Sequence, residues 1–194
     1  MSAAPMISFP EDGAAPLWEV TREPQSAQQL QRLAAGLAAS LEPGDLLVLS
    51  GDLGAGKTTF TQGLGRGLGV REGIISPTFV LVRIHPSLRG GPQLVHVDAY
   101  RLEAAEEVDG LDLESTMDGS VTVVEWGAGR VEHLSDSRLT VDLNRPSGPD
   151  RGPDGTRTPI QRDYEDDLDE PRTLHLSGWG PRWAAGPPGL PALD

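Results

Sequence analysis

The chain has 194 residues, a net charge of −13 and a pI near 4.6, and its length fits one domain with a sizeable core. Such an acidic protein is expected to bind nucleic acid poorly on its own, because nucleic acid carries a dense negative charge. The absence of cysteine excludes disulfides, thiolate chemistry and cysteine-based zinc sites.

The N-terminal segment, residues 1–17, is rich in Ala, Pro and Gly and is predicted to be a disordered leader. It has neither the basic flank nor the apolar run of a signal peptide. No stretch of the chain approaches the roughly 20 apolar residues that a membrane helix needs. A cytoplasmic protein that does not bind a membrane is therefore expected.

The domain is predicted to begin with a strand, a helix and a second strand. Residues 18–21 are the expected edge strand. Ser26 is predicted to cap a helix whose apolar residues recur at helical spacing up to Leu41, with Gln29 completing a capping box. The wholly apolar run at residues 46–49 is typical of a buried parallel strand.

Further helices and strands are expected along the rest of the domain, which is predicted to span residues 18–178. A second helix should run from Lys57 to about Leu68. Residues 79–85 and 94–97 are predicted to pair as an antiparallel hairpin. The remaining elements are a partly helical segment at residues 103–117 and strands at residues 121–124, 139–143 and 173–176.

Two other segments differ in composition from the domain. Residues 144–171 hold five Pro, three Gly, eight acidic and four basic residues and almost nothing apolar, which predicts a disordered acidic insertion. Residues 179–194 are predicted to form a Pro/Gly-rich tail after the domain.

The string GDLGAGKT at residues 51–58 matches the phosphate-binding pattern GxxxxGK[ST] between a predicted strand and a predicted helix. Glycines in such a loop let backbone N–H groups cradle phosphate oxygens at the N-terminus of the helix. Lys57 is expected to neutralise the β- and γ-phosphates, and the Thr58 hydroxyl to coordinate Mg²⁺.

This loop predicts an α/β, P-loop NTPase-like three-layer fold, with a mixed central sheet and helices on both faces. The expected cofactors are ATP, or another nucleoside triphosphate, and Mg²⁺. The predicted nucleotide-binding residues of the loop are Gly51, Asp52, Leu53, Gly54, Ala55, Gly56, Lys57, Thr58 and Thr59.

Two acidic residues end predicted strands. Asp98 and Glu125 each follow a buried apolar run, which places them at the edge of the sheet where ligands bind in open α/β proteins. An isolated acid at a strand end is as a rule a solvated terminus. In a small domain with a P-loop, both acids are instead candidates to complete the magnesium shell or to position water.

The polar residues near these acids have more than one interpretation. Ser76, Pro77 and Thr78 form either a switch loop that senses the γ-phosphate or an ordinary turn. No histidine is assigned a catalytic or metal role, and His96 is predicted to face the opposite side of its strand from its valine neighbours. Trp126 is predicted to pack rather than to take part in chemistry.

Four strings in order along the chain resemble the TsaE family of ATPases. They are GDLGAGKTT at residues 51–59, SPTFVLV at 76–82, HVDAYRL at 96–102 and VVEWG at 123–127. The resemblance covers roughly residues 18–143 and resumes at residues 172–177. Members of this family belong to the bacterial pathway that makes threonylcarbamoyladenosine in tRNA.

The resemblance implies an accessory subunit that hydrolyses ATP to keep a TsaB–TsaD transferase pair cycling, with tRNA reached only through the partner. By similarity, Thr58 and Glu125 bind Mg²⁺, and Asp98 is needed for hydrolysis. The other residues implied are Lys57 and Thr78 as catalytic residues, with Thr78 in the switch-like loop, and Arg172 as a nucleotide contact from the C-terminal strands.

The sequence departs from the family where Val97 and Ala99 replace the usual Phe and Leu beside Asp98, and these apolar changes leave the chemistry intact. Two other functions stay open. A small-molecule kinase would use the same P-loop, although no Arg-rich lid is evident. A nucleotide-gated binding module with negligible hydrolysis would use overlapping residues.

Overall fold

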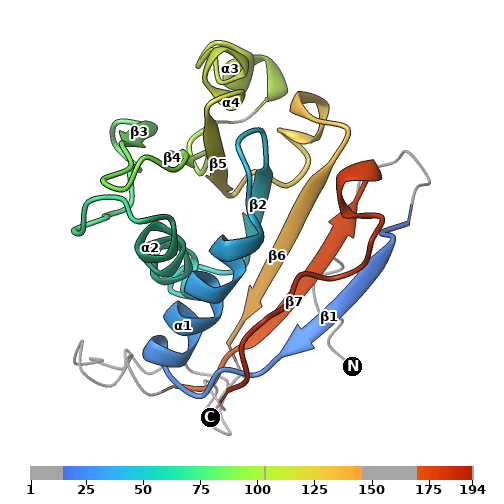
Figure 1. Cartoon of the computed structure of the whole chain (residues 1–194). Coiled ribbons are helices and arrows are strands. Elements are labelled where there is room, and N and C mark those ends of the chain that lie inside the picture. Colours follow the sequence, from blue (N-terminus) through green and yellow to red (C-terminus); the bar gives the residue numbers. More distant parts are fainter. Residues whose placement is uncertain (1–14, 103, 146–169, 194) are drawn as a thin grey trace, which may run out of the picture.

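The centre of the molecule is a mixed β-sheet (Figure 1). The computed structural model describes residues 15–102, 104–145 and 170–193. Across these residues the order is β1-β7-β6-β2-β5-β4-β3, in which β6, β2, β5 and β4 are parallel and β1, β7 and β3 run antiparallel to their neighbours. The bounds are β1 Trp18–Arg22, β2 Leu46–Ser50, β3 Val82–His85, β4 Gln93–Asp98, β5 Ser120–Glu125, β6 Arg138–Asn144 and β7 Thr173–Trp179.

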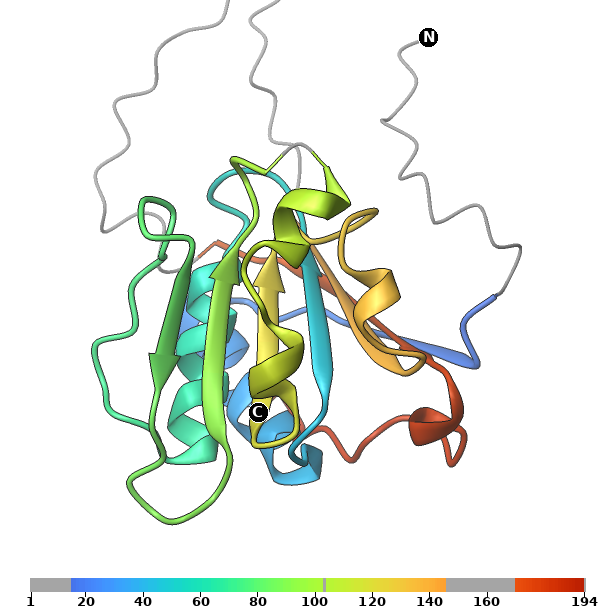
Figure 2. The same cartoon turned by 90° about the horizontal axis from the view of Figure 1, so that it is seen from above.

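Helices cover both faces of this sheet (Figures 1 and 2). On one face, α1 (Ala27–Leu37, extended by a 3₁₀ turn at Ala38–Ser40) lies beside α2 (Lys57–Leu68). On the other face lie α3 (Ala105–Asp109), α4 (Glu114–Met117) and a 3₁₀ turn at Glu132–Leu134. The predicted fold class is therefore confirmed. None of the described helices is long and apolar enough to cross a membrane.

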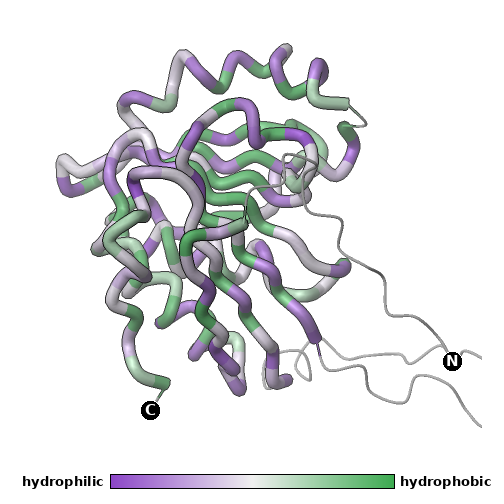
Figure 3. The backbone as a smooth tube through the Cα atoms, turned by 90° about the vertical axis from the view of Figure 1, so that its right-hand side faces the viewer, coloured by the Kyte–Doolittle hydropathy of each residue, from purple (hydrophilic) through white to green (hydrophobic). Residues whose placement is uncertain are grey.

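Two apolar layers sandwich the sheet because successive side chains of a strand point to opposite faces. In β5, Val123 packs in the layer under α1 and α2, while Val124 packs in the layer under α3 and α4. The central strands are buried on both faces, which explains the unbroken apolar run of β2. Figure 3 shows the hydrophobic segments gathered in these strands.

The start of α1 agrees with the prediction in part. The Ser26 hydroxyl accepts a hydrogen bond from the Gln29 backbone N–H at 3.2 Å, as an N-cap should. The Gln29 side chain does not complete a capping box, because its Oε1 accepts from the Gln25 backbone N–H at 2.8 Å. The Gln29 side chain therefore binds the backbone of Gln25, the residue before the N-cap.

The predicted strand at residues 79–85 begins later than expected, at Val82. The backbone N–H groups of Val80 and Leu81 both donate to the Pro77 carbonyl, and Leu81 has a positive φ of 65°. This turn keeps residues 79–81 out of β3, although the Leu81 carbonyl still accepts a hydrogen bond from the Asp98 backbone N–H at 2.9 Å, and Phe79 is left 84% exposed. The apolar composition of the segment misled the prediction.

The predicted domain boundaries need two corrections. Asn144 belongs to β6 and pairs with Thr173, so the insertion begins one residue later than predicted. The domain does not end at residue 178, because β7 continues to Trp179 and the following Trp183 is buried in the core. Residues 1–14 and 146–169 lie outside the described residues, so the disorder predicted for them is not tested.

Candidate functional site

The loop between β2 and α2 has the backbone shape that the glycine pattern predicts. Gly51 has a φ of 131°, and a Cβ there would lie 2.1 Å from the Leu143 carbonyl oxygen. Gly56 has a φ of 107° and is the N-cap of α2. Side chains are disfavoured in this left-handed region, so only glycine allows the loop to turn into the helix at this point.

Lys57 is the first residue of α2 and is 5% exposed. Its ammonium donates to the carbonyl oxygens of Gly51 and Asp52, at 2.7 and 2.9 Å. Burial lowers the pKa of this amine, and the negative charges of Glu125, Asp98 and Asp52 oppose that shift. The loop therefore holds a desolvated positive charge whose counter-charges lie mainly across the cavity.

Trp126 forms a wall beside this ammonium. Its ring centroid lies 3.7 Å from the Lys57 Nζ atom, and its ring contacts that of Tyr100 at a centroid distance of 5.2 Å. The tryptophan directly follows β5, and its backbone has a φ of 61° while its N–H donates to Leu49. This strained conformation directs the ring to the site. The packing predicted for Trp126 therefore includes a contact with the Lys57 ammonium.

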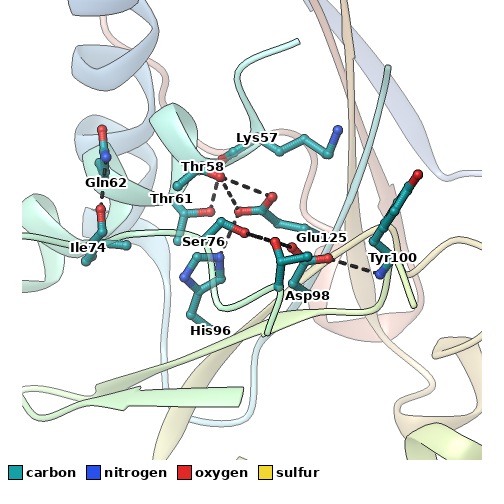
Figure 4. Close-up of polar contacts among 11 residues, drawn as sticks. Lys57, Thr58, Thr61, Gln62, Ile74, Ser76, His96, Asp98, Tyr100 and Glu125 are labelled. Carbon is teal, nitrogen blue, oxygen red and sulfur yellow. Dashed lines mark hydrogen bonds and ion pairs between the residues drawn. The ribbon is translucent and has the colours of Figure 1, made fainter. Parts of the chain in front are cut away.

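Thr58 and Glu125 meet directly (Figure 4). The Thr58 hydroxyl donates to the Glu125 carboxylate, with Oγ1 3.0 Å from Oε1 and 3.2 Å from Oε2. His96 Nε2 lies 2.8 Å from the same Oε1. One carboxylate therefore connects α2, β5 and β4, and both Glu125 and His96 are buried.

Asp98 is the second buried acid of the site. Its Oδ2 accepts hydrogen bonds from the hydroxyls of Ser76 and Thr78, at 2.7 and 2.6 Å, and its Oδ1 accepts from the Tyr100 backbone N–H at 3.0 Å. The loop at residues 76–78 is thereby tied to the acid (Figure 4). A change at this loop would reach the Asp98 carboxylate directly.

The sheet explains why these two acids are neighbours. β4 and β5 are parallel, and Asp98 is paired with Glu125 in their register. Both residues end their strands, so both carboxylates lie at the same edge of the sheet as the loop that follows β2. The position predicted for both acids is confirmed, while their roles stay predictions.

Arg172 reaches the loop from the segment before β7. It is 4% exposed, its Nε donates to the Ala55 carbonyl at 3.2 Å, and its backbone N–H donates to Pro24. A Cβ on Gly56 would lie 3.2 Å from Arg172 Nε. The C-terminal part of the chain therefore touches the loop between β2 and α2, although it is more than a hundred residues away in sequence.

These groups surround a cavity of about 520 Å³. Of the predicted residues, Gly51, Asp52 and Ala55 do not line it, and Ala55 is fully buried.

The described residues contain no group of three or more His, Asp or Glu that could hold a metal ion alone. The lining residues are Ala27, Leu53, Gly54, Gly56, Lys57, Thr58, Thr59, Ser76, Thr78, Asp98, Tyr100, Glu125, Trp126 and Arg172.

Sequence reasoning missed two side chains that contact the predicted acids. His96 could have been found, because it lies two residues before Asp98 and a strand places such residues on one face. Ser76 was noted only as part of a polar loop, yet its hydroxyl binds Asp98 as Thr78 does. No local pattern predicts that contact, since it depends on how the loop folds over β4.

The fold and this loop define an α/β protein of the P-loop NTPase-like class. A family model described as "Threonylcarbamoyl adenosine biosynthesis protein TsaE" matches residues 24–152. The chain belongs to the TsaE family.

Individual relatives agree with this assignment. A protein of Streptomyces coelicolor named tRNA threonylcarbamoyladenosine biosynthesis protein TsaE is 48% identical over 156 residues, which cover 80% of this chain and 94% of the relative. A protein of the same name from Bacillus subtilis is 38% identical over 145 residues, covering 75% and 87%. The crystal structure of Bacillus subtilis YdiB is 27% identical and superposes with a TM-score of 0.61, covering 87% of this chain and 90% of that chain.

Proposed function

We propose that this chain is a magnesium-dependent ATPase that serves as an accessory subunit in the formation of threonylcarbamoyladenosine in tRNA. The observation that carries the proposal is the meeting of Lys57, Thr58, Asp98 and Glu125 around one cavity, in a chain of the TsaE family. The names of the relatives supply the pathway, and the residues of the cavity supply the chemistry.

The triphosphate would bind at the loop before α2. Backbone N–H groups at the N-terminus of this helix attract anions, and the buried Lys57 ammonium adds a full positive charge. The Lys57 charge lies in a desolvated site, where its attraction to phosphate is stronger than in water. Arg172 would contact the nucleotide from the far side of the loop.

Mg²⁺ would be held by Thr58 and Glu125, together with oxygens of the nucleotide. The fit rests on the donor chemistry, since a hydroxyl and a carboxylate 3.0 Å apart offer the hard oxygen ligands that Mg²⁺ prefers. A site with one carboxylate and few protein ligands is usual where phosphates complete the shell. The ion would neutralise charge that develops on the phosphates.

Asp98 would hold the water that attacks the γ-phosphate. A carboxylate has about four acceptor sites. Three are used by Ser76, Thr78 and Tyr100, and Oδ1 accepts only the last of these hydrogen bonds, which leaves it a lone pair for water. Thr78 would couple the position of the loop to that of the acid.

The partner would be a TsaB–TsaD transferase pair, with tRNA bound by the partner and not by this chain. The net charge of −13 supports this arrangement, because it repels the tRNA backbone. A role in tRNA modification supports a cytoplasmic location as part of this proposal.

ATP turnover by the purified chain, with and without the TsaB–TsaD pair, tests the proposal. We expect slow turnover alone, an increase with the pair, and loss of turnover in Asp98→Asn with ATP binding retained. Transfer of the γ-phosphate to a metabolite would instead identify a small-molecule kinase. Nucleotide-dependent docking to the pair without any turnover would identify a binding module.

A further inference from the structure

His96 occupies a fully buried position at the back of the site. It lies in β4 between Leu94 and Asp98, and its side chain shares their face of the sheet. Its Nε2 atom lies 2.8 Å from Glu125 Oε1 (Figure 4), and His96 is not among the residues that line the cavity. Strand β4 therefore supplies both Asp98 and a contact to the other acid.

Among the described residues, the imidazole has one hydrogen-bond partner, the Glu125 carboxylate. An ionised carboxylate only accepts hydrogen bonds, so His96 Nε2 must donate to Glu125. The other ring nitrogen, Nδ1, is buried and has no hydrogen-bond partner among the described residues. The ring is therefore held by the hydrogen bond at Nε2, and Nδ1 makes no competing hydrogen bond with the described residues.

The Glu125 carboxylate is consequently fixed from two directions. Thr58 donates to it from α2, and His96 donates to it from β4. Of these two donors, the Thr58 hydroxyl faces the cavity and is itself a proposed magnesium ligand. The imidazole is not a proposed ligand, so it would keep its contact with Glu125 when an ion is bound.

We propose that His96 is a positioning residue that orients Glu125 and thereby sets the affinity of the site for Mg²⁺. This inference rests on the proposed magnesium site. A partner that orients a ligating carboxylate typically changes metal affinity by about 10- to 100-fold when it is removed. Because His96 does not line the cavity, its loss should leave metal-free nucleotide binding unchanged.

The test compares His96→Leu, which removes the donor, with His96→Gln, which keeps an N–H at a similar reach. A fluorescent ATP analogue is titrated with Mg²⁺ for each protein, and its affinity is also measured in excess EDTA. Leu94→Ala is the matched control, because Leu94 is equally buried on the same face of the same strand. Thermal unfolding of each variant shows whether the protein is folded.

We expect His96→Leu to need about 10- to 100-fold more Mg²⁺ than the wild type. His96→Gln should recover most of that loss, and Leu94→Ala should lower the unfolding temperature without changing the Mg²⁺ requirement. An unchanged requirement in His96→Leu, or an equal loss in His96→Leu and His96→Gln, would overturn the role of His96. If Mg²⁺ does not affect nucleotide binding by the wild type, the magnesium site itself is wrong.

Discussion

Charged side chains are buried at both ends of strand β2, but they are paired with each other at one end and surround a cavity at the other. Before its first residue, Asp45 is 5% exposed and is paired with Arg182, whose Nε lies 3.1 Å from Oδ1 and whose Nη2 also donates to the Ser40 carbonyl. Beyond its last residue, Lys57, Asp98 and Glu125 surround an open cavity. The charges at the first end satisfy each other, while those at the second end are left facing a space that a ligand can fill.

We therefore assign a structural role to the charges at the first end, while those at the second end belong to the proposed ligand site. A buried charge is costly unless it is paired, and the pair at Asp45 fastens the C-terminal segment to the domain. At the other end, a ligand that carries both phosphate and a cation would complement the ammonium and the carboxylates together. Substitutions at the first end of β2 should therefore change the stability of the protein, and substitutions at the second end should change ATP binding or turnover.

Lys57→Met gives the largest expected effect on function. ATP turnover should be lost, because the charge that we propose neutralises the phosphates is gone. The unfolding temperature should not fall. Burial lowers the pKa of Lys57, so at a pH below that pKa the charged amine destabilises the folded state. Methionine removes this destabilising charge and fills a similar space. Turnover assays and thermal unfolding check both expectations.

Arg66→Met is the matched control, since it removes a basic side chain from the last turn of the same helix. It should leave turnover unchanged. Turnover that survives in Lys57→Met would contradict the assignment of the loop.

Arg182→Ala should lower the stability of the protein without affecting ATP binding, which is the opposite of the result expected for Lys57→Met. Losing this partner leaves the Asp45 carboxylate buried, so the free energy of unfolding should fall by about 2 kcal/mol. For a chain of this size, that corresponds to a drop in unfolding temperature of about 4–8 °C. ATP affinity should be unaffected. A weaker effect of the same change in an Asp45→Asn background would show that the pair is the cause, whereas additive effects would show that it is not.

Asp142→Asn should give a small effect that depends on pH. Burial raises the pKa of Asp142 above its ordinary value of 3.8, against the opposing effects of His175 and a hydrogen bond from Ser50. The folded state thus holds this proton to a higher pH than the unfolded chain, so the stability linked to the proton is complete below pH 3.8 and is lost as the pH rises through the folded-state pKa.

At neutral pH the asparagine variant should therefore unfold at a slightly higher temperature than the wild type, and the gain should vanish towards pH 3.8. Unfolding curves at a series of pH values measure this. A gain that is the same at every pH would show that the charge of Asp142 is not responsible.

Much of the site could be predicted from sequence because the features that determine it are local. The glycine spacing before Lys57 requires one loop shape, and Asp98 and Glu125 each end an apolar run. Parallel strands then bring both acids to one edge of the sheet. The resemblance to the TsaE family assigned the loop and both acids to a single site, and the family match agrees with this resemblance.

The remaining features depend on tertiary contacts that no local pattern records. Residues 79–81 are apolar but form a turn, because Pro77 offers a carbonyl to two successive N–H groups. The tail has the composition of an exposed segment, yet Trp183 is 3% exposed and Trp18 Nε1 donates to its carbonyl. The approach of Trp126 to Lys57 depends on a positive φ that its residue type does not predict.

Equilibrium binding of ATP to the whole chain, measured with Mg²⁺ and in excess EDTA, is the most direct test of the proposed nucleotide site. The wild type should bind ATP, and Mg²⁺ should tighten the binding because, in the proposed site, Thr58 and Glu125 would share the ion with the phosphates. Absence of ATP binding under both conditions, in protein that unfolds cooperatively on heating, would contradict a nucleotide site at this end of β2.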